Sequence, residues 1–439
     1  MQGFLNNLQR YANNVALISE DKTYTYKQLL QDINQTSLSL PIPNQSVVSL
    51  VGEFDYKSIV NFFALALRQC IIAPLPKNSP NNHKKQAIIS SNFCIEDSKI
   101  THSITQITHP LIEKLKKINQ SGLIIFSSGS TGEPKAMLHN LDIITQTHYN
   151  QKENQVNTIS IFLFDHIAGI DVLLRQLSIG GTLTLPPRRT PECVCQQIEK
   201  HKVQILPAPP TFLNLIVLSK AYLHHDLSSL RLISYGSETI APTLISHLKE
   251  IFPQVKLKQS FGTSETNAIK IKTQDELFIK LSDPNIEYKI VEGELWIKSK
   301  TQVLGYLNAS MESFVDGYFK TGDLVESKII NGEEYLRIIG RAKEMINVGG
   351  EKVLPQEVEG VIMQIDGILD CLVYGERNAI TGQSVSCEVV VDETKIPTNE
   401  VKKTIRSFCK GKIDNYKIPS KVICKESLES SERFKKRRV

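Results

Sequence analysis

Long apolar runs are missing from this sequence of 439 residues. A membrane-spanning helix needs roughly 18 or more uninterrupted apolar residues, and the most apolar stretch, residues 59–75, is interrupted by Asn61, Arg68 and Gln69. The N-terminus, MQGFLNNLQRYANN, lacks the order of basic and then apolar residues that marks a secretory signal. We therefore expect no membrane span and a cytoplasmic location.

Paired cysteines with metal-ligand spacing are also absent. The chain has eight Cys but no CxxC pair, and the pair Cys193 and Cys195 has no matching second pair that could complete a zinc cage. We expect isolated thiols, without a structural metal or a redox role.

An excess of one charge is absent from the body of the chain. The net charge of +5 comes from 51 Lys and Arg against 46 Asp and Glu, and residues 433–439 alone hold five basic side chains and no acid. A protein that binds duplex nucleic acid needs a basic face spread over a domain. We therefore expect no nucleic-acid partner and interpret the basic tail as solvated.

The remaining composition is that of a folded, multi-domain protein. Hydrophobic residues make up 41% and charged residues 22% of the chain, which excludes disorder, collagen and a disulfide scaffold as descriptions of the whole chain. Domains average roughly 150 residues, so this length predicts more than one. We find no internal repeat and no low-complexity tract.

Short β-branched and aromatic runs alternate with helix-length segments over the first two thirds of the chain. This alternation predicts buried parallel strands with helices on their faces. The expected strands lie at residues 47–52, 70–76, 123–126, 159–164, 203–206, 230–235 and 255–261, and expected helices include residues 58–67 and 211–220.

The pattern changes twice in the last third. From about residue 285, alternating segments such as GELWIKS (residues 293–299) predict half-exposed antiparallel strands. From Lys343 the sequence predicts a small α+β domain, with a helix beginning near Pro355, a helix over 400–409 and the strand SCEVVVD. The expected fold class is α/β: a large domain, residues 1–342, of parallel and mixed sheets with helices and a β-rich portion at about 285–342, followed by a small mobile α+β domain, residues 343–439.

The segment FSSGSTGEPK, residues 126–135, follows an apolar strand. Its backbone N–H groups can converge, its hydroxyls add donors and Lys135 adds a positive charge, so it could cradle phosphates. It is not a Walker A loop, because Pro134 stands where that pattern requires Gly. Most Gly/Ser loops are ordinary turns, but this string is far rarer than a generic one.

With four further motifs in order, this segment resembles the adenylate-forming (AMP-binding) superfamily, which includes acyl-CoA and aryl-CoA synthetases, nonribosomal-peptide adenylation domains and beetle luciferases. The resemblance covers nearly the whole chain. The further motifs are YGSE (residues 235–238), SFGTSE (260–265), YFKTGDL (318–324) and GRAKEMINVGGEKVLPQEVE (340–359).

The resemblance implies that the chain joins a carboxylate to the α-phosphorus of ATP and expels pyrophosphate. Charge builds on phosphoryl oxygens in that transition state, so donors and cations must converge. Glu265 would bind Mg²⁺, and Ser264, where the family usually has Thr, would hydrogen-bond the α-phosphate. The implied ATP/AMP-binding residues are Ser127, Ser128, Gly129, Ser130, Thr131, Gly132, Lys135, Ser237, Glu238, Phe261, Gly262, Asp323 and Arg341.

Several of these residues have specific expected contacts. Phe261 replaces a family Tyr that stacks on adenine, Asp323 would bind the ribose hydroxyls with Arg341 nearby, and His166 would form a wall that positions the acid. Asp165 and Ala136 depart from the family pattern. The expected acyl pocket comprises His166, Ile170, Tyr235, Asn267 and Ala268.

The resemblance also implies a C-terminal domain that turns between two half-reactions. Lys343 matches the hinge, and Gly349 and Gly350 would allow close approach of a pantetheine arm. The catalytic lysine is expected at Lys435, with Lys436 as the alternative. The match is weak there, because Glu429 stands for the family's Pro and Phe434 for its Gly.

The predicted function is that of an ATP- and Mg²⁺-dependent ligase that activates a fatty or aryl carboxylic acid and transfers it to the thiol of coenzyme A. Transfer to the phosphopantetheine of a separate acyl carrier protein is the close alternative. A nucleotide-binding protein with impaired catalysis would keep the Ser/Gly loop and Asp323 but release no pyrophosphate. A nucleic-acid ligase would need a basic groove and a nucleophilic lysine motif, and neither is visible.

Overall fold

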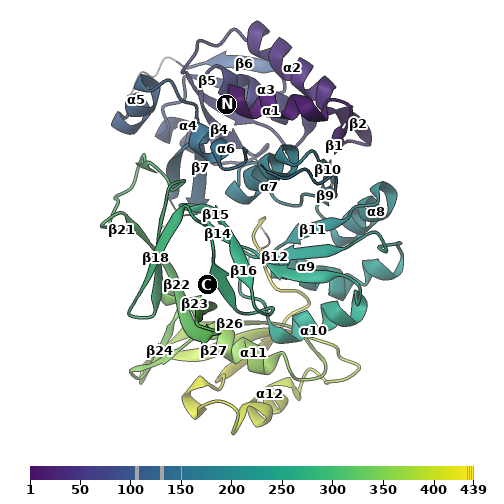
Figure 1. Ribbon diagram of the computed structural model, residues 1–439. Helices are drawn as coiled ribbons and strands as arrows, with labels where there is room; N and C mark the ends of the chain where they lie inside the picture. Colours follow the sequence, from purple (N-terminus) through teal and green to yellow (C-terminus); the bar gives the residue numbers. More distant parts are fainter. Residues whose placement is uncertain are drawn as a thin grey trace.

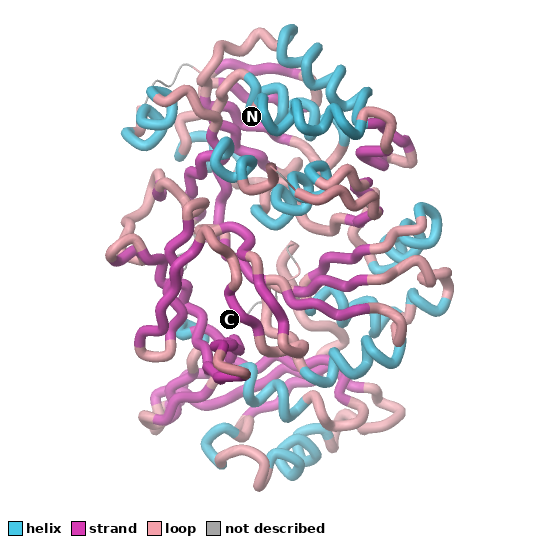
Figure 2. Tube along the Cα trace, viewed as in Figure 1, coloured by secondary structure: helices cyan, strands magenta, loops and turns pink. Residues whose placement is uncertain are grey.

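The computed structural model describes residues 1–103, 108–128, 133–149 and 151–432, together with Phe434, Lys436 and Arg438. The chain forms two α/β layers, a layer of antiparallel strands and a smaller C-terminal body, with the N-terminus and the C-terminal body at opposite ends (Figure 1). Helices lie mainly beside the α/β layers and the C-terminal body, whereas the antiparallel layer consists mainly of strands and loops (Figure 2). The predicted α/β fold class is confirmed.

The first sheet contains the phosphate-loop hairpin. Strands β3, β4, β5 and β7 pair in parallel, and β7 pairs antiparallel with β8. In spatial order the strands are β20 (Gly305–Tyr306), β8 (Pro134–Asn140), β7 (Gly122–Ser128), β4 (Ile71–Leu75), β3 (Val47–Val51), β5 (Phe93–Glu96) and β6 (Lys99–His102). The β3–α3–β4 unit matches the predicted strand, helix and strand.

The second sheet is parallel except at one edge, where β1 and β2 form a hairpin. In spatial order its strands are β13 (Lys256–Gln259), β12 (Leu232–Tyr235), β11 (Ile205–Ala208), β9 (Asn157–Ile159), β10 (Thr182–Leu185), β1 (Val15–Ser19) and β2 (Lys22–Thr25). Helices α8, α9 and α10 lie beside the β11–β13 end of this sheet (Figure 1).

The helices of both α/β layers begin with recognisable signals. Thr25 and Gln28 form a reciprocal capping box, Asp55 caps α3, and several helices begin with Pro. The helices are α1 (Gln2–Leu8), α2 (Tyr26–Ser39), α3 (Tyr56–Leu67), α4 (Asn82–Ile88), α5 (Pro110–Lys117), α6 (Leu141–Gln146), α7 (Ile167–Ser178), α8 (Pro191–His201), α9 (Pro210–Ser219) and α10 (Pro242–Ile251), with the 3₁₀ turns η1 (Gln9–Tyr11) and η2 (Ala221–Leu223).

Antiparallel strands form the third layer, as predicted, but they begin at Ile271, before residue 285. The small hairpin β14 (Phe261–Thr263) and β15 (Asn267–Ile269) leads into this layer. Its strands are β16 (Ile271–Thr273), β17 (Ile279–Leu281), β23 (Glu333–Arg341), β22 (Tyr318–Ile330), β19 (Glu294–Ser299) and β18 (Ile286–Val291), with β21 (Phe314–Val315) paired to β22.

The C-terminal body has its own hydrophobic cluster, formed by residues between 346 and 424. Its helix α11 begins at Pro355, and α12 covers most of the predicted helix over 400–409. Its elements are η3 (Ala342–Glu344), β24 (Ile346–Val348), β25 (Glu351–Val353), α11 (Pro355–Ile362), β26 (Ile368–Asn378), β27 (Gly382–Val391), α12 (Val401–Cys409), η4 (Asn415–Lys417) and β28 (Lys421–Cys424). The domain boundary at residue 343 stays a prediction.

Two predicted strands are wrong in extent. The run 159–164 is strand only at Asn157–Ile159, after which the chain leaves the sheet, and Phe164 packs against Phe54 and Phe62. The run 255–261 is divided, because the backbone N–H and hydroxyl of Ser260 both donate to the carbonyl of Tyr235. Phe261 then begins a different hairpin.

No helix in the described part of the chain has the length and apolar character that a membrane crossing requires.

Buried histidines make the stability of this fold depend on pH. Burial lowers the pKa of His139, on β8, to about 4, although the backbone of Ser264 opposes the shift, and burial likewise lowers the pKa of His148 to about 4. Each ring has a pKa near 6.5 when unfolded, so the unfolded chain binds more protons between pH 6.5 and pH 4. The stability therefore falls as the pH drops through this window.

We predict that His139→Gln weakens this pH dependence, because one of the two buried titrating rings is removed. Each buried ring can contribute up to about 3 kcal/mol to the loss of stability over the whole window. Urea unfolding between pH 7.5 and pH 5 measures the slope, with the exposed His247→Gln as control. An unchanged slope in His139→Gln would contradict the assignment.

Candidate active site

A cleft of about 2290 Å³ lies between the sheets of the large body, residues 1–341, and the C-terminal body. Its lining contains most of the residues singled out by the sequence motifs. These are Ser127, Lys135, His166, Ser237, Glu238, Phe261, Gly262, Ser264, Glu265, Asn267, Ala268, Asp323, Arg341 and Lys343.

The β7–β8 hairpin holds the phosphate-loop motif at one wall of the cleft. Ser127, near the end of β7, lies opposite Lys135 in the antiparallel register. Gly129, Ser130, Thr131 and Gly132 lie outside the described residues, as does the side chain of Ser128. The two ends of the predicted phosphate cradle therefore face the cleft in the structure, and the role of the loop between them stays a prediction.

The turn between β14 and β15 carries Ser264 and Glu265. The hydroxyl of Thr263 accepts hydrogen bonds from the backbone N–H groups of Glu265 (3.2 Å) and Thr266 (3.0 Å), which fixes the turn. Gly262 must be glycine, because a Cβ there would lie 2.6 Å from the carbonyl oxygen of Asn267. The motif thus shapes a tight turn that holds a carboxylate at the cleft.

Tyr306 joins the phosphate hairpin to this turn. Its hydroxyl donates to Glu265 Oε1 at 3.2 Å, and the Nζ atom of Lys135 lies 5.7 Å from its ring centroid. Burial raises the pKa of Glu265, and this effect exceeds the opposing influence of Tyr306, Arg341 and Lys135. The carboxylate is therefore poorly solvated and would gain from a positive ligand.

The segment 303–308 extends this link along the backbone. The N–H of Val303 donates to the carbonyl of Glu265 (2.8 Å), and the side chain of Asn308 bonds both neighbours of Lys135, accepting from Ala136 N (2.8 Å) and donating to Pro134 O (2.9 Å). Neither Tyr306 nor Asn308 was predicted to be a site residue. Their sequence, GYLN, shows no chemical pattern until the strand pairing places it beside β8.

The carboxylate oxygens that Glu265 offers as metal ligands suit Mg²⁺ better than a transition metal. Mg²⁺ is a hard cation that is usually bound through one or two carboxylates together with substrate phosphates. No group of three or more His, Cys, Asp or Glu residues with metal-binding geometry occurs in the described residues. A single half-buried carboxylate is the protein ligand expected for a metal ion that arrives already bound to the phosphates of a nucleotide.

Asp323 and Arg341 meet across the β22–β23 ladder. They are direct partners in the register, and Arg341 Nε lies 2.9 Å from Asp323 Oδ1. The side chain of Asp323 is only 7% exposed, against 39% for Arg341. The structure confirms that the two residues are neighbours, as the motifs predicted, and the ion pair fixes the orientation of the carboxylate at the cleft.

The expected adenine segment lines the opposite side of the cleft. Phe261 is buried at the start of β14, and Ser237 adopts φ +71°, a left-handed conformation that is uncommon outside Gly and Asn. Glu238 accepts a hydrogen bond from Thr211 Oγ1 at 2.7 Å.

The acyl-pocket residues divide into two groups. His166, at the N-cap of α7, lines the cleft together with Asn267 and Ala268. Ile170 and Tyr235, which were also predicted to line it, belong instead to two hydrophobic clusters, and the hydroxyl of Tyr235 donates to the carbonyl of Glu276 at 2.5 Å. Packing of α7 and β12 turns these two side chains away from the cleft lining.

Two further cationic side chains line the cleft and were not predicted. Arg175, in the last turn of α7, and Lys270 both line the cleft and are exposed. Near them, His148 Nε2 lies 4.0 Å from Asp171 Oδ1. Within the described residues Arg175 makes no hydrogen bond or ion pair through its guanidinium, so it is available to an anion.

The hinge and pantetheine residues lie on different surfaces. Lys343 lies in η3 and is exposed at the cleft. Gly349 and Gly350 form the exposed turn between β24 and β25, with φ +62° and +97°. They do not line the cleft in this arrangement, and the predicted approach of a pantetheine arm past them stays a prediction.

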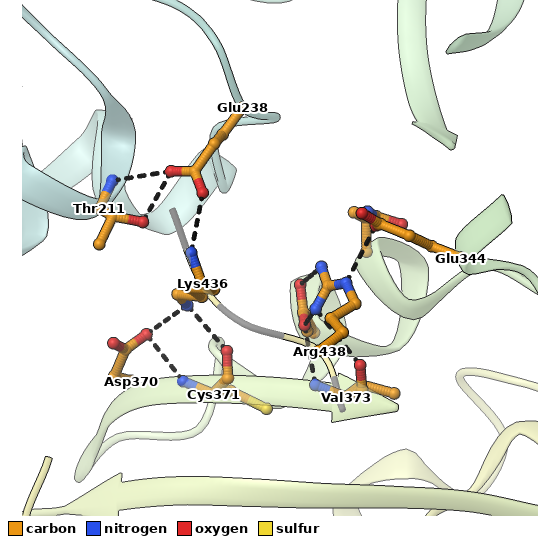
Figure 3. A network of polar contacts seen from close by, with 10 residues as sticks. Thr211, Glu238, Glu344, Asp370, Cys371, Val373, Lys436 and Arg438 are labelled. Carbon is orange, nitrogen blue, oxygen red and sulfur yellow. Dashed lines mark hydrogen bonds and ion pairs between the residues drawn. The ribbon is translucent and has the colours of Figure 1, made fainter. Parts of the chain in front are cut away.

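The C-terminal tail, described at residues 425–432, 434, 436 and 438, reaches the cleft from the C-terminal body (Figure 3). Lys435 lies outside the described residues. Lys436 Nζ lies 2.6 Å from Asp370 Oδ1 and 2.8 Å from the carbonyl oxygen of Cys371. Burial alone would lower the pKa of Lys436, but the carboxylates of Asp370 and Glu359 raise it.

Comparison with known proteins identifies the family. The AMP-binding enzyme family model matches residues 83–307, and the model of the AMP-binding enzyme C-terminal domain matches residues 357–435. The chain belongs to the AMP-binding enzyme family, as the motifs predicted.

Curated relatives are CoA ligases. The 2-succinylbenzoate–CoA ligase of Listeria monocytogenes is 24% identical over 94% of this chain and 92% of its own length. The 4-coumarate–CoA ligase-like 9 protein of Arabidopsis thaliana is 30% identical over 58% of this chain and 51% of its own length.

Solved structures share the whole fold. The anthranilate CoA ligase AuaEII, in complex with anthranoyl-AMP, superimposes with a TM-score of 0.83 at 20% identity, covering 99% of this chain and 95% of that one. The o-succinylbenzoate CoA synthetase MenE of Bacillus subtilis, in complex with the acyl-adenylate OSB-AMP, superimposes with a TM-score of 0.77 at 21% identity. The match covers 98% of this chain and 96% of that one.

We predict that Asp323→Ala weakens ATP binding by about 1.5 to 3 kcal/mol, because it removes a charged acceptor for ribose hydroxyls and leaves Arg341 without its partner. Calorimetric titration with ATP measures the affinity. Asp366→Ala serves as control, since that carboxylate forms an exposed surface ion pair with Lys395. Unchanged ATP affinity in Asp323→Ala would refute the ribose role.

Proposed function

We propose that this AMP-forming ligase activates a carboxylic acid with ATP to an acyl-adenylate and then transfers the acyl group to the thiol of coenzyme A, in the cytosol. The main support is the gathering of Lys135, Glu265 and the Asp323–Arg341 pair around one cleft. The CoA ligases among the relatives support the same reaction class. A pantetheinylated carrier protein presents the same thiol and is the alternative acceptor.

The residues of the chain would bind the nucleotide at its phosphates, its ribose and its adenine. Lys135 and Ser127 would hold the outer phosphates, Ser264 would donate to the α-phosphate, and Asp323 would accept from the ribose hydroxyls. Mg²⁺ held by Glu265 would neutralise phosphate charge. Phe261 offers a π face to the adenine.

The reaction then proceeds in two displacements. A carboxylate oxygen of the acid attacks the α-phosphorus, and the bond from that phosphorus to the pyrophosphate oxygen breaks. In the second half-reaction the sulfur of a thiolate attacks the acyl carbon and AMP leaves with the carboxyl-derived oxygen. Adenylation is needed because AMP leaves far more readily than oxide or hydroxide.

We assign the catalytic lysine of the first half-reaction to Lys435. Supporting this, the alternative Lys436 has its ammonium engaged by Asp370 and by the carbonyl of Cys371, and is mostly buried. A lysine held in this way would have to give up a buried ion pair to reach a substrate.

For the acid, we propose an aryl carboxylic acid with a second carboxylate. Arg175 and Lys270 bring positive charge to the cleft. The carboxylates near them are Asp171, whose Oδ1 lies 4.0 Å from His148 Nε2, and Asp283, which accepts a hydrogen bond from the backbone N–H of Lys270 at 3.2 Å. The name of the Listeria relative, 2-succinylbenzoate–CoA ligase, describes an aromatic acid with two carboxylates. Arg175 would receive the carboxylate that does not react.

A substrate panel tests this assignment. We predict that aryl acids with a second carboxylate release pyrophosphate with a KM at least about tenfold lower than matched monocarboxylic acids, and that Arg175→Gln removes this preference. The panel includes fatty, aryl and amino acids, each with coenzyme A, with a pantetheinylated carrier, or with neither. The control is Arg231→Gln, an exposed arginine outside the cleft.

Three outcomes of the panel decide between the proposed reaction, a nucleotide-binding protein without catalysis, and the proposed anion site. Pyrophosphate release that needs an added acid supports the adenylate reaction. No release with any acid would contradict it and favour a nucleotide-binding protein without catalysis. A preference that survives in Arg175→Gln would contradict the proposed anion site.

We predict that Lys435→Ala slows pyrophosphate release by at least about a hundredfold but leaves thioester formation from supplied acyl-adenylate nearly unchanged, because this lysine would act only while negative charge builds on the phosphate. Both half-reactions are measured separately. Normal pyrophosphate release in the variant would show that Lys435 has been misassigned.

A further inference from the structure

The C-terminal tail contacts both bodies of the protein. On the large body, the backbone N–H of Lys436 donates to Glu238 Oε1 at 3.1 Å (Figure 3). The ring of Phe434 lies 4.7 Å from that of Phe212, and the guanidinium of Arg189 lies 5.2 Å from the Phe434 centroid. We call this set of contacts the tail clasp: Glu238, Phe212 and Arg189 on the large body, holding Phe434 and the N–H of Lys436.

The same tail is fixed to the C-terminal body by ion pairs. Arg438 binds both carboxylate oxygens of Glu359, at 2.7 and 3.2 Å, and its Nε lies 3.0 Å from Glu344 Oε2 (Figure 3). Lys436 is held by Asp370. Bidentate pairs of this kind hold both distance and direction. The tail therefore moves with the C-terminal body, and the clasp is the part of its contacts that crosses to the large body.

Glu238 is occupied by protein donors on both oxygens. Oε2 accepts from the hydroxyl of Thr211 at 2.7 Å, and from its backbone N–H at 3.4 Å, at the first turn of α9, while Oε1 accepts from Lys436. A carboxylate at a helix N-terminus is favourably placed, and Thr211 fixes its orientation. This leaves Glu238 aimed at the tail, whereas the sequence motifs predicted it to bind nucleotide.

The backbone conformation of Phe434 also indicates that the tail is held in place by its contacts. It stands where the family pattern has Gly, and its backbone has φ +53°, a left-handed conformation that is unfavourable for residues with a Cβ. Such a conformation persists only where surrounding contacts hold it. Here the contacts are the Phe212 ring and Arg189, whose Nη1 also donates to the carbonyl of Glu432 at 2.8 Å.

We propose that Glu238 is a positioning residue that docks the tail on the large body for the first half-reaction, with Phe434 as the second docking point. This inference rests on the proposed two-step function. If the C-terminal body turns between the half-reactions, the clasp must break, whereas the ion pairs of Lys436 and Arg438 travel with that body. The clasp therefore contributes to adenylation and not to thioester formation.

The substitution Glu238→Gln tests the docking role with little change in shape. A Gln side chain has one acceptor oxygen and an NH₂ group that cannot accept from Lys436 N–H while the oxygen stays on Thr211. We expect pyrophosphate release to fall by at least about tenfold, the KM for ATP to stay within about twofold, and thioester formation from supplied acyl-adenylate to stay within about twofold.

Glu250→Gln is the matched control, because Glu250 is an exposed glutamate on α10, outside the cleft. Phe434→Ala provides a second variant that leaves Glu238 in place, and we expect it to slow pyrophosphate release selectively as well. A general folding defect would slow both half-reactions equally, which contradicts a docking role.

Other outcomes separate the two proposals. A raised KM for ATP in Glu238→Gln with an unchanged maximal rate would show that Glu238 binds nucleotide, and would overturn the docking role. Wild-type rates in both half-reactions would overturn it too. If the unmodified protein releases no pyrophosphate with any acid of the panel, it is the proposed function that fails.

Discussion

The hydrogen bonds of residues 303–308 hold the two functional walls of the cleft together. On one side they bond the strand that carries Lys135, through Leu304, Leu307 and Asn308, and on the other they bond the backbone and side chain of Glu265. Without this connection a cation from one sheet and a carboxylate from a separate hairpin would have no fixed distance. Phosphoryl transfer depends on such prearranged charges more than on covalent participation of the protein.

The carboxylates of Asp323 and Glu265 are held at the cleft in different ways, and this difference suits their proposed roles. Asp323 has a direct cationic partner in Arg341, so its charge is balanced in the absence of nucleotide. Glu265 has a neutral hydroxyl donor in Tyr306, and burial raises its pKa. A carboxylate with an incomplete set of partners is the one that gains from a divalent cation arriving with ATP. The tail, which Glu359 and Asp370 hold to the C-terminal body, would then supply positive charge from that body.

The sequence predicts best what is encoded within a few neighbouring residues. The runs around β3, β4 and β7 and the helix start at Pro355 are local signals, and the structure contains them. The family motifs implied that Arg341 lies near Asp323, but not that the two side chains form an ion pair. The limits of β9 and the division at Ser260 could not be predicted, because they depend on hydrogen bonds and ring contacts between distant segments.

The unexpected site residues have the same explanation. Tyr306, Asn308, Thr211 and Arg438 are ordinary residue types whose roles exist only through partners far away in the chain. Likewise Tyr235, which belongs to the YGSE motif, and Ile170 were expected at the cleft, and only the packing of β12 and α7 places them in the core.

In the proposed reaction the acid is joined to the α-phosphorus through one of its own oxygens. Labelling the carboxyl group of an accepted acid with ¹⁸O and analysing the AMP by mass spectrometry after turnover tests this most directly. We predict that each AMP contains one labelled oxygen derived from the acid. AMP without label, formed together with the thioester, would contradict an acyl-adenylate and with it the assignment of the cleft.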